Sequence, residues 1–406
     1  MRRLSGGVTA PIGFQANGLA CGIKKSKKKD LALIYSERPC EAAGVFTTNQ
    51  VQASCVVINK QQLKDGRAQA MIVNSGNANC MTGESGFENS RTMILQTARA
   101  LGIEKKNVLV ASTGVIGRPL PMRKILGAIP DLVKGLSRKG GEAAAGAILT
   151  TDRVVKEAAV EFHIGRRRVR VGAIAKGACM IHPQLALIPR HATMLCFATT
   201  DADISAAALR LALDRAAGRT FNTITIDGDT STNDMALVLA NGMAQNRRIV
   251  EKTPDCRAFT EALEAVFGVM ARQMIKDAEG ATKFVEVAAR GAASRQDARA
   301  VAKTVAGSNL VKCALFGSDP NWGRIAAAAG RAEAHVDPWK LQIFLGKELV
   351  LKNGGRVATN AAVLNRVFAQ KNIRITVDLG LGKYAATAYT CDFSTSYVRI
   401  NSAYRT

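Results

Sequence analysis

Histidine, aromatic residues and long apolar runs are all scarce in this sequence. It has 406 residues but four histidines, and these do not combine with the cysteines into the two closely spaced ligand pairs of a structural zinc site. A structural zinc site needs such spacing, so no metal is predicted. No apolar run approaches the ~18–20 residues that a membrane-spanning helix requires, and no apolar stretch follows the basic N-terminus as in a secretory signal. We therefore expect a cytoplasmic protein that makes no membrane contact.

The cysteines are also arranged in a way that excludes common uses. There are nine, an odd number, and no two form a C-x-x-C pair. Together with the missing secretory signal, this favours reduced thiols over a disulfide framework. The composition is 47% hydrophobic and 22% charged, which is typical of an ordinary globular protein with a buried core.

Acidic residues are few relative to basic ones. The chain has 32 Asp and Glu against 56 Lys and Arg, a formal charge of +24. Such a charge can indicate nucleic-acid binding. However, dense basic runs occur only at 24–29 and 166–170, and aromatic residues make up 5% of the chain, which leaves little for base stacking. We interpret most of the charge as solvated surface and do not favour a nucleic-acid partner, while a role toward polyanions or acidic substrates stays open.

The hydrophobic pattern predicts a mixture of strands and helices. β-branched runs predict strands at 30–36, 70–74, 107–111, 221–226 and 373–379. Helical spacing predicts helices at 89–101, 204–217, 257–277 and 359–369, with Asp203 capping the second of these and Gly218 ending it. This mixture favours an α/β (α+β) protein with layered packing over a helical bundle.

Several motifs fail on inspection. The acidic stretch 227–234 begins like a calcium loop, but Thr232 and Val238 stand where an EF-hand needs glycine and glutamate. The stretch 380–383 ends like a phosphate loop, but Tyr384 replaces the required Ser or Thr. No G-x-S-x-G motif is present. The usual nucleotide-binding and serine-hydrolase interpretations therefore do not apply.

Three other stretches hold residues suited to catalysis. Small residues at 111–118 follow an apolar strand and could aim backbone N–H groups and the Thr113 hydroxyl at a developing oxyanion. Lys176 stands beside the flexible Gly177, and Thr193 stands where an irregular polar stretch meets an apolar run. Taken one at a time, these patterns favour ordinary turn and strand positions.

Taken together and in order, however, short stretches along the chain carry a family resemblance. They include D-G-D-T-S-T-N-D at 227–234 and S-D-P-N-W-G-R at 318–324. The full set is 9–14, 22–24, 30–34, 44–49, 74–79, 112–117, 148–152, 192–195, 227–234, 277–283, 318–324, 397–401 and 404–406. Over nearly its whole length the chain resembles the ornithine acetyltransferase (glutamate N-acetyltransferase) family.

The resemblance implies a fold and a maturation step. The fold is a layered αββα-like sandwich with chemistry close to that of N-terminal-nucleophile hydrolases. The precursor cleaves itself between Ala192 and Thr193, giving an α chain of residues 1–192 and a β chain of residues 193–406. Two α and two β chains are expected to assemble.

The resemblance also implies a reaction. Thr193 would be the nucleophile, and its freed α-amine, with a pKa near ~8, would be the internal base. Thr113 and Gly114 would stabilise the oxyanion. The acetyl group would pass from N-acetylornithine to Thr193 and then to glutamate, in a ping-pong transfer that needs no cofactor. The use of acetyl-CoA as a second acetyl donor stays open.

Substrate-binding residues follow from the same resemblance. They would be Thr150, Thr151, Lys176, Thr193, Glu279, Asn401 and Thr406. The charge of Lys176 suits a substrate carboxylate, and that of Glu279 suits the ornithine amine. The acidic stretch from Asp227 would shape the site without taking part in the reaction.

The segment before Thr193 departs from the family pattern. It is about six residues longer than the pattern, Cys179 replaces a glycine, and self-cleavage depends on a strained, well-placed peptide. His182 and His191 in this segment either assist proton transfer or are solvated. The alternative interpretation is an uncleaved, catalytically idle basic binding protein on the same fold.

Overall fold

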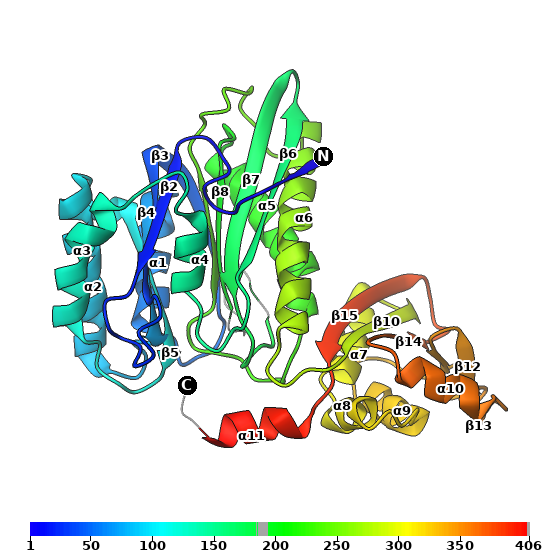
Figure 1. The fold of residues 1–406 in the computed structure, drawn as a ribbon. Helices are drawn as coiled ribbons and strands as arrows, with labels where there is room; N and C mark the ends of the chain where they lie inside the picture. Colours follow the sequence, from blue (N-terminus) through cyan, green and yellow to red (C-terminus); the bar gives the residue numbers. More distant parts are fainter. Residues whose placement is uncertain (184, 186–193, 404–406) are drawn as a thin grey trace. The chain divides into compact units, whose positions relative to one another are not determined.

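The computed structural model describes residues 1–183, 185 and 194–403, and Figure 1 shows the chain as a ribbon. The chain forms two compact units, which are described separately here. Among the described residues, the first unit holds those of 1–222 and 230–274, and the second holds 223–229 and 275–403. The predicted division at residue 193 is a covalent one, and it stays a prediction.

The first unit is built on a nine-stranded mixed sheet. The order is β1-β6-β7-β8-β9-β3-β4-β5, with β2 paired to β3 outside this path. Its strands are β1 (Arg2–Leu4), β2 (Phe14–Leu19), β3 (Leu31–Phe46), β4 (Arg67–Asn77), β5 (Val108–Val115), β6 (Lys156–Ile164), β7 (Arg167–Lys176), β8 (Leu195–Thr200) and β9 (Met235–Ala240).

Helices cover this sheet in layers. They are α1 (Ser54–Gln62), α2 (Gly83–Leu101), α3 (Met122–Lys134), α4 (Gly141–Ala147), α5 (Ala206–Arg219) and α6 (Pro254–Lys276). Helices α2 and α3 lie side by side, and α4 packs on β2 and β3 (Figure 1). The strands between these layers are almost wholly buried; for example, every residue of β8 and β9 is buried. Strands covered on both faces read as continuous apolar runs, which is why the sequence pattern predicts parts of β3, β4 and β5, although it does not predict β8 and β9.

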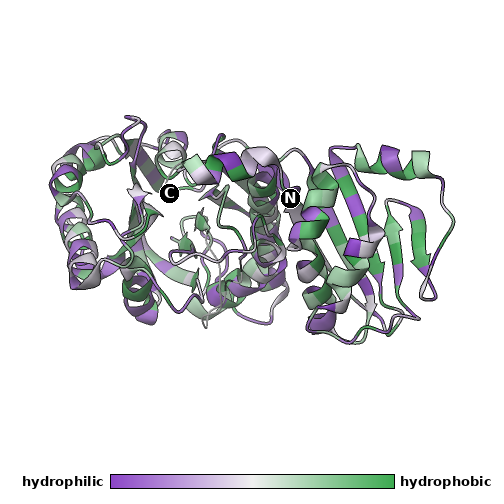
Figure 2. Ribbon diagram, turned by 90° about the horizontal axis from the view of Figure 1, so that it is seen from below, coloured by the Kyte–Doolittle hydropathy of each residue, from purple (hydrophilic) through white to green (hydrophobic). Residues whose placement is uncertain are grey.

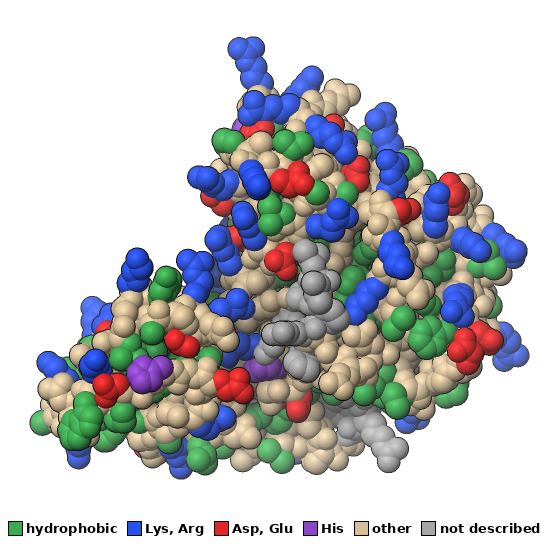
Figure 3. Space-filling model, turned by 180° about the vertical axis from the view of Figure 1, so that it is seen from behind, with side chains coloured by type: hydrophobic (Ala, Val, Ile, Leu, Met, Phe, Trp, Pro, Cys, Tyr) green, Lys and Arg blue, Asp and Glu red, His purple; other side chains and the backbone are tan. Residues whose placement is uncertain are grey.

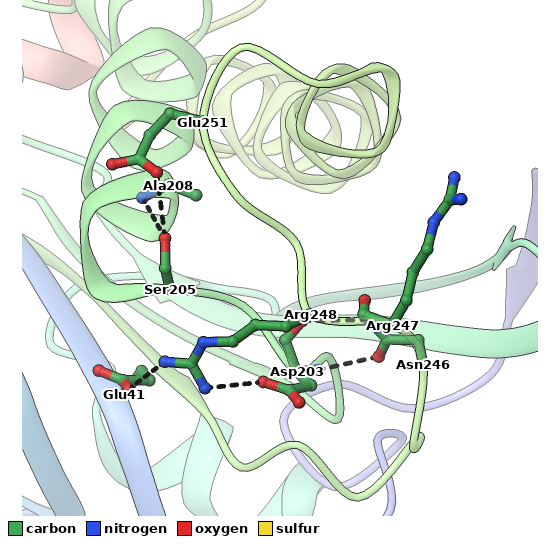
Figure 4. Close-up of polar contacts among 8 residues, drawn as sticks. All are labelled: Glu41, Asp203, Ser205, Ala208, Asn246, Arg247, Arg248 and Glu251. Atoms are coloured by element: carbon green, nitrogen blue, oxygen red, sulfur yellow. Dashed lines mark hydrogen bonds and ion pairs between the residues drawn. The ribbon is translucent and has the colours of Figure 1, made fainter.

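The start of α5 differs from the prediction. Ser205, not Asp203, caps the helix, because its hydroxyl accepts a 3.1 Å hydrogen bond from the Ala208 amide (Figure 4). Asp203 lies two residues too early to cap, and its carboxylate pairs with Arg248 at 3.0 Å. The backbone N–H of Asp203 is bound by the side chain of Asn246, which holds the chain extended before the helix begins.

The end of α5 also differs. The helix continues through Gly218 and ends at Arg219. The hydroxyl of Thr220 donates to the Ala216 carbonyl at 2.6 Å, and its amide donates to the Ala217 carbonyl. Because Thr220 binds these terminal carbonyls, the glycine is not needed as a stop.

The second unit is a six-stranded sheet with helices packed on it. The strand order is β13-β12-β11-β14-β10-β15, and β10 pairs in parallel with β14. Its strands are β10 (Phe284–Ala292), β11 (Gln342–Leu345), β12 (Glu348–Lys352), β13 (Gly355–Arg356), β14 (Asn372–Asp378) and β15 (Tyr384–Cys391). Its helices are α7 (Arg295–Ala306), α8 (Asn309–Phe316), α9 (Trp322–Gly330), α10 (Ala361–Phe368) and α11 (Thr395–Ala403).

Each unit has its own apolar core. Figure 2 shows hydrophobic residues concentrated in the strands. In the first unit, Phe14, Phe197 and Phe267 are fully buried, while in the second, helix α7 packs its valines against β10 and β15. Each such side chain contributes about 1.5–3 kcal/mol by leaving water. The predicted α/β class with layered packing is confirmed.

The prediction of a strand at 221–226 is wrong. Residues Phe221–Thr223 form a short 3-10 turn, and Ile224 makes one isolated bridge to Tyr389. The ring of Phe221 packs on Phe267 at 4.8 Å instead of entering a ladder. The chain passes here from one compact unit into the other, so no neighbouring strand extends the pairing.

The distribution of surface charge and the state of the cysteines can be compared with the sequence predictions. Figure 3 shows Lys and Arg side chains scattered over the face in view, with Asp and Glu among them. All nine cysteines lie in the described part of the chain and are free thiols. Among the described residues, no helix combines the length and the apolar character that crossing a membrane requires.

Candidate active site

The end of strand β5 holds the first two candidate residues, Thr113 and Gly114. The apolar residues 108–110 bury this strand in the sheet, and it pairs in parallel with β4, Thr113 opposite Ser75 and Gly114 opposite Gly76. The expected turn at 111–118 is therefore partly strand, because the pairing continues to Val115 with an irregularity beside Gly76.

Only glycine fits at position 114. Its φ of +133° is one that L side chains rarely adopt, and a β-carbon there would lie 2.4 Å from the carbonyl carbon of Gly76. The close approach of the two strands thus sets the backbone geometry at the end of β5. This is the kind of constrained, small-residue backbone that can present N–H groups to an oxyanion.

Lys176 is the last residue of β7, and its side chain reaches the same place. Its ammonium lies 3.4 Å from the Thr113 hydroxyl, and the residue is 5% exposed. Burial lowers the pKa of Lys176, and the charge of Asp152 opposes this effect. Within the described part of the chain, Lys176 forms no ion pair. Asp152 and Asp234 interact with this charge without forming a salt bridge to it, so the buried ammonium is suited to bind an anionic group of a ligand.

A buried ion pair supports the end of β7, where Lys176 lies. Lys156 donates a 2.7 Å hydrogen bond to Asp152, and both side chains are fully buried. The same carboxylate accepts hydrogen bonds from the backbone N–H groups of Gly177, at 2.7 Å, and Thr150, at 3.2 Å. Burial raises the pKa of Asp152, but the charges of Lys176 and Lys156 and these hydrogen bonds outweigh it and hold the pKa below its usual range.

The strand that follows the predicted cleavage site starts beside these groups. Leu195, the first residue of β8, is in register with Lys176 on one side and with Met235 on the other. The carbonyl of Met194 accepts a 3.0 Å hydrogen bond from Met235. The carboxyl of Asp234, just before Met235, is fully buried, which raises its pKa well above the usual value; the Thr47 hydroxyl and Lys176 oppose this.

Two further candidates meet in the second unit. The Asn401 side chain on α11 donates a 2.8 Å hydrogen bond to the Glu279 carboxylate. Glu279 is 6% exposed, and Asn401 is exposed. A carboxylate has several acceptor positions, so one that binds the Asn401 amide can also accept a hydrogen bond from a ligand ammonium.

The remaining candidates are placed as follows. Thr150 and Thr151 are half-buried in the turn held by Asp152. Ala192, Thr193 and Thr406 lie outside the described residues. Among the described residues, no group of three or more His, Cys, Asp or Glu side chains is arranged to hold a metal ion.

Comparison with known proteins covers almost the whole chain. The ArgJ family model matches residues 15–406. The chain belongs to the ArgJ family.

Similar proteins of this family come from several bacteria. The arginine biosynthesis bifunctional protein ArgJ of Symbiobacterium thermophilum is 49% identical over 100% of both chains. That of Caldanaerobacter subterraneus is 46% identical, again over 100% of both. Among solved structures, a chain of ornithine acetyltransferase from Mycobacterium tuberculosis, complexed with ornithine, is 45% identical. It matches 46% of this chain and 99% of that chain, with a TM-score of 0.44.

For this ArgJ-family chain, sequence reasoning missed one cation near the site. Lys24 belongs to a basic run interpreted as solvated surface, yet it is half-buried, and its pKa falls to about 8. Burial is the main cause, and the charge of Lys176 adds to it. The only signal in the sequence is that Lys24 closes one of the family-like stretches, 22–24, directly before the exposed lysines.

The ion pair between Asp152 and Lys156 was also missed as a pair. Asp152 closes a family-like stretch, but the sequence gives no reason to expect a fully buried lysine four residues later. A lysine is rarely buried unless it is paired, so a charged residue at the first position of a strand is normally taken for surface.

Proposed function

We propose that this chain transfers an acetyl group from N-acetylornithine to glutamate through an acetyl-threonine intermediate on Thr193. The nucleophile is freed by self-cleavage between Ala192 and Thr193. The resulting α and β chains assemble as two of each. No cofactor takes part, and acetyl-CoA serves as a second acetyl donor for glutamate.

The coarser part of this function follows from the family. As a member of the ArgJ family, matched over residues 15–406, the chain is an acetyltransferase enzyme of arginine biosynthesis. The identity of 49% over the full length of a relative leaves no large region of the chain without a counterpart.

One observation carries the finer proposal. The end of β5, the end of β7 and the start of β8 meet at one place in the first unit. Lys176 contacts Thr113 at 3.4 Å and is in register with Leu195, two residues after Thr193 in the chain. Groups from stretches far apart in the sequence thus meet at the start of β8, the strand that follows the proposed nucleophile in the sequence, and this supports the proposal.

The proposed reaction balances with these groups. The α-amine of Thr193, with a pKa near ~8, takes the hydroxyl proton as the oxygen attacks the acetyl carbonyl. Thr113 and Gly114 stabilise the oxyanion, an interaction whose loss typically costs ~10²–10³ in rate. The C–N bond to ornithine breaks, and the proton passes to the leaving amine. Glutamate then attacks the ester through its amine and regenerates the Thr193 hydroxyl.

Substrate binding is assigned by charge. Lys176 binds the α-carboxylate that both substrates carry, in place of the ion pair it lacks among the described residues. Glu279, oriented by Asn401, binds the side-chain ammonium of ornithine. Thr150, Thr151 and Thr406 complete the substrate contacts.

The experiment that tests this function first asks whether the chain cleaves itself before Thr193. Intact mass and N-terminal sequencing of wild type should give two fragments, one starting Thr-Met-Leu-Cys. Thr193→Ala should stay intact and inactive, and Thr193→Ser should cleave and retain slower transfer because serine keeps a hydroxyl beside the α-amine. An uncut wild type without transfer would contradict the proposal.

The alternative is the uncleaved basic binding protein, which the charge of +24 favours. It predicts an intact chain whose nucleic-acid binding falls steeply with salt. Acetyl transfer that is insensitive to salt would exclude it.

A further inference from the structure

A second lysine stands next to Lys176, and its position is built by a buried carboxylate. Asp30 is fully buried and accepts hydrogen bonds from the backbone N–H groups of Cys21, Ile23 and Lys24 at 2.6, 2.7 and 3.0 Å. Three such bonds to one carboxylate define the path of the loop after β2. Lys24 is therefore placed by the fold and is not a free surface side chain.

The Lys24 side chain lies over the strand that adjoins the proposed oxyanion turn. A β-carbon built at Gly76 would lie 3.0 Å from Lys24 Cγ, so only glycine lets the lysine pack so closely. Gly76 in turn pairs with Gly114 on β5. Lys24 thus lies one strand away from Gly114, on the same end of the sheet as Lys176.

Neither of the two ammonium groups is neutralised by a salt bridge within the described part of the chain. Lys24 Nζ donates a 2.6 Å hydrogen bond to the Lys29 carbonyl, and among the described residues neither Lys24 nor Lys176 forms an ion pair. Of the carboxylates near them, Asp30 is bound by backbone N–H groups and Asp152 by Lys156 and the Gly177 backbone. Asp234 also interacts with the Lys176 charge, but its burial raises its pKa well above the usual value and so disfavours its charged form. Two like charges in one low-dielectric region favour an anionic ligand between them.

We propose that Lys24 is a specificity-determining residue that binds the second carboxylate of the acetyl acceptor. This inference rests on the proposed function. Glutamate carries two carboxylates, whereas N-acetylornithine carries one and an ammonium. Lys176 binds the α-carboxylate common to both substrates, and Lys24 binds the γ-carboxylate that only the acceptor has.

The test compares two acceptors that differ at this group. Glutamine has the shape of glutamate but a neutral carboxamide in place of the γ-carboxylate. Lys24→Met should lower the preference for glutamate over glutamine, measured as the ratio of kcat/KM values, by ~10–100-fold. The kcat/KM for N-acetylornithine should change less than about twofold, because in a ping-pong transfer this ratio depends only on the donor half-reaction, which does not use Lys24. Lys24→Arg should keep most of the preference, since it keeps the charge.

Lys25→Met is the matched control. It removes the same charge from the same loop, but the side chain is exposed, so the preference should stay at the wild-type value. A ratio of kcat/KM values does not depend on the fraction of folded enzyme, so partial misfolding of a variant does not alter the result. An unchanged preference in Lys24→Met, or an equal loss in Lys25→Met, would overturn the inference. Absence of any transfer in wild type would instead overturn the proposed function.

Discussion

Lys156 donates a 2.7 Å hydrogen bond to Asp152, and both side chains are fully buried beside the candidate site. The carboxylate also binds the backbone N–H groups of Thr150 and Gly177, so one group links two chain segments that hold candidate substrate contacts. Removing either charge affects the positions of both segments.

We expect Lys156→Met to destabilise the protein and slow transfer together. Asp152 would keep a buried charge with one partner fewer, and breaking a buried pair in this way costs about 3–5 kcal/mol. Denaturant unfolding measures this loss, and steady-state kinetics measures the fall in kcat/KM. The double variant Lys156→Met/Asp152→Asn should recover part of the stability, because it leaves no uncompensated carboxylate. A single variant as stable as wild type would contradict this account.

We expect substitution of Gly114 to reduce the rate of catalysis more than it reduces the stability of the protein. In Gly114→Ala the new β-carbon would lie 2.4 Å from the Gly76 carbonyl carbon, so the two strand ends must separate. Transfer and self-cleavage should both fall by at least ~100-fold, the usual effect of a lost oxyanion donor. Gly117→Ala is the control: Gly117 also has a positive φ, of +77°, but nothing lies within 4 Å of its added β-carbon. This control should fold and cleave with activity within a few-fold of wild type.

The pH dependence of glutamate binding reports on Lys24. Its pKa is lowered to about 8 by burial and by Lys176 and Lys28, while Asp30 and Asp152 act in the opposite direction. The ammonium is therefore present below pH 8 and is lost as the pH rises through that value. The KM for glutamate should rise above pH 8, while the KM for glutamine should not. In Lys24→Arg the rise should vanish, because a guanidinium stays charged. A rise that persists in the arginine variant would assign it to another group.

The sequence predicts those elements whose local pattern and tertiary environment agree. Residues 70–74 and 107–111 read as strands because both faces of β4 and β5 are covered. The segment 221–226 has the same β-branched composition, yet it crosses between two units and finds no ladder. At α5, Asp203 and Ser205 are both good capping residues, and the choice depends on Arg248 and Asn246, which lie more than 40 positions away.

In the candidate site, too, the local sequence predicts individual residues but not the long-range contacts between them. Family-like stretches single out Thr113, Lys176 and Glu279, but short-range patterns say nothing of which ones meet. The register of β7 with β8 brings Lys176 to the start of β8, and that depends on long-range pairing. Lys24 could not be told from the exposed lysines after it, because its burial comes from Asp30 and Gly76.

The pair of Glu279 and Asn401 predicts how the donor is selected. If Glu279 binds the ornithine ammonium, wild type should prefer N-acetylornithine over N-acetylnorvaline, which has the same chain length but no amine. Glu279→Gln should reduce this preference by ~10-fold or more, because a charge-assisted hydrogen bond becomes a neutral one. Glu286→Gln is the matched control, since Glu286 is an acid of the same unit that pairs with Arg374 at 3.3 Å near the surface. The ratio of kcat/KM values for the two donors is the measurement. If Glu279→Gln keeps the wild-type preference, another carboxylate binds the ornithine ammonium. If kcat/KM falls equally for both donors, Glu279 has a structural role, in which Asn401 helps to hold it.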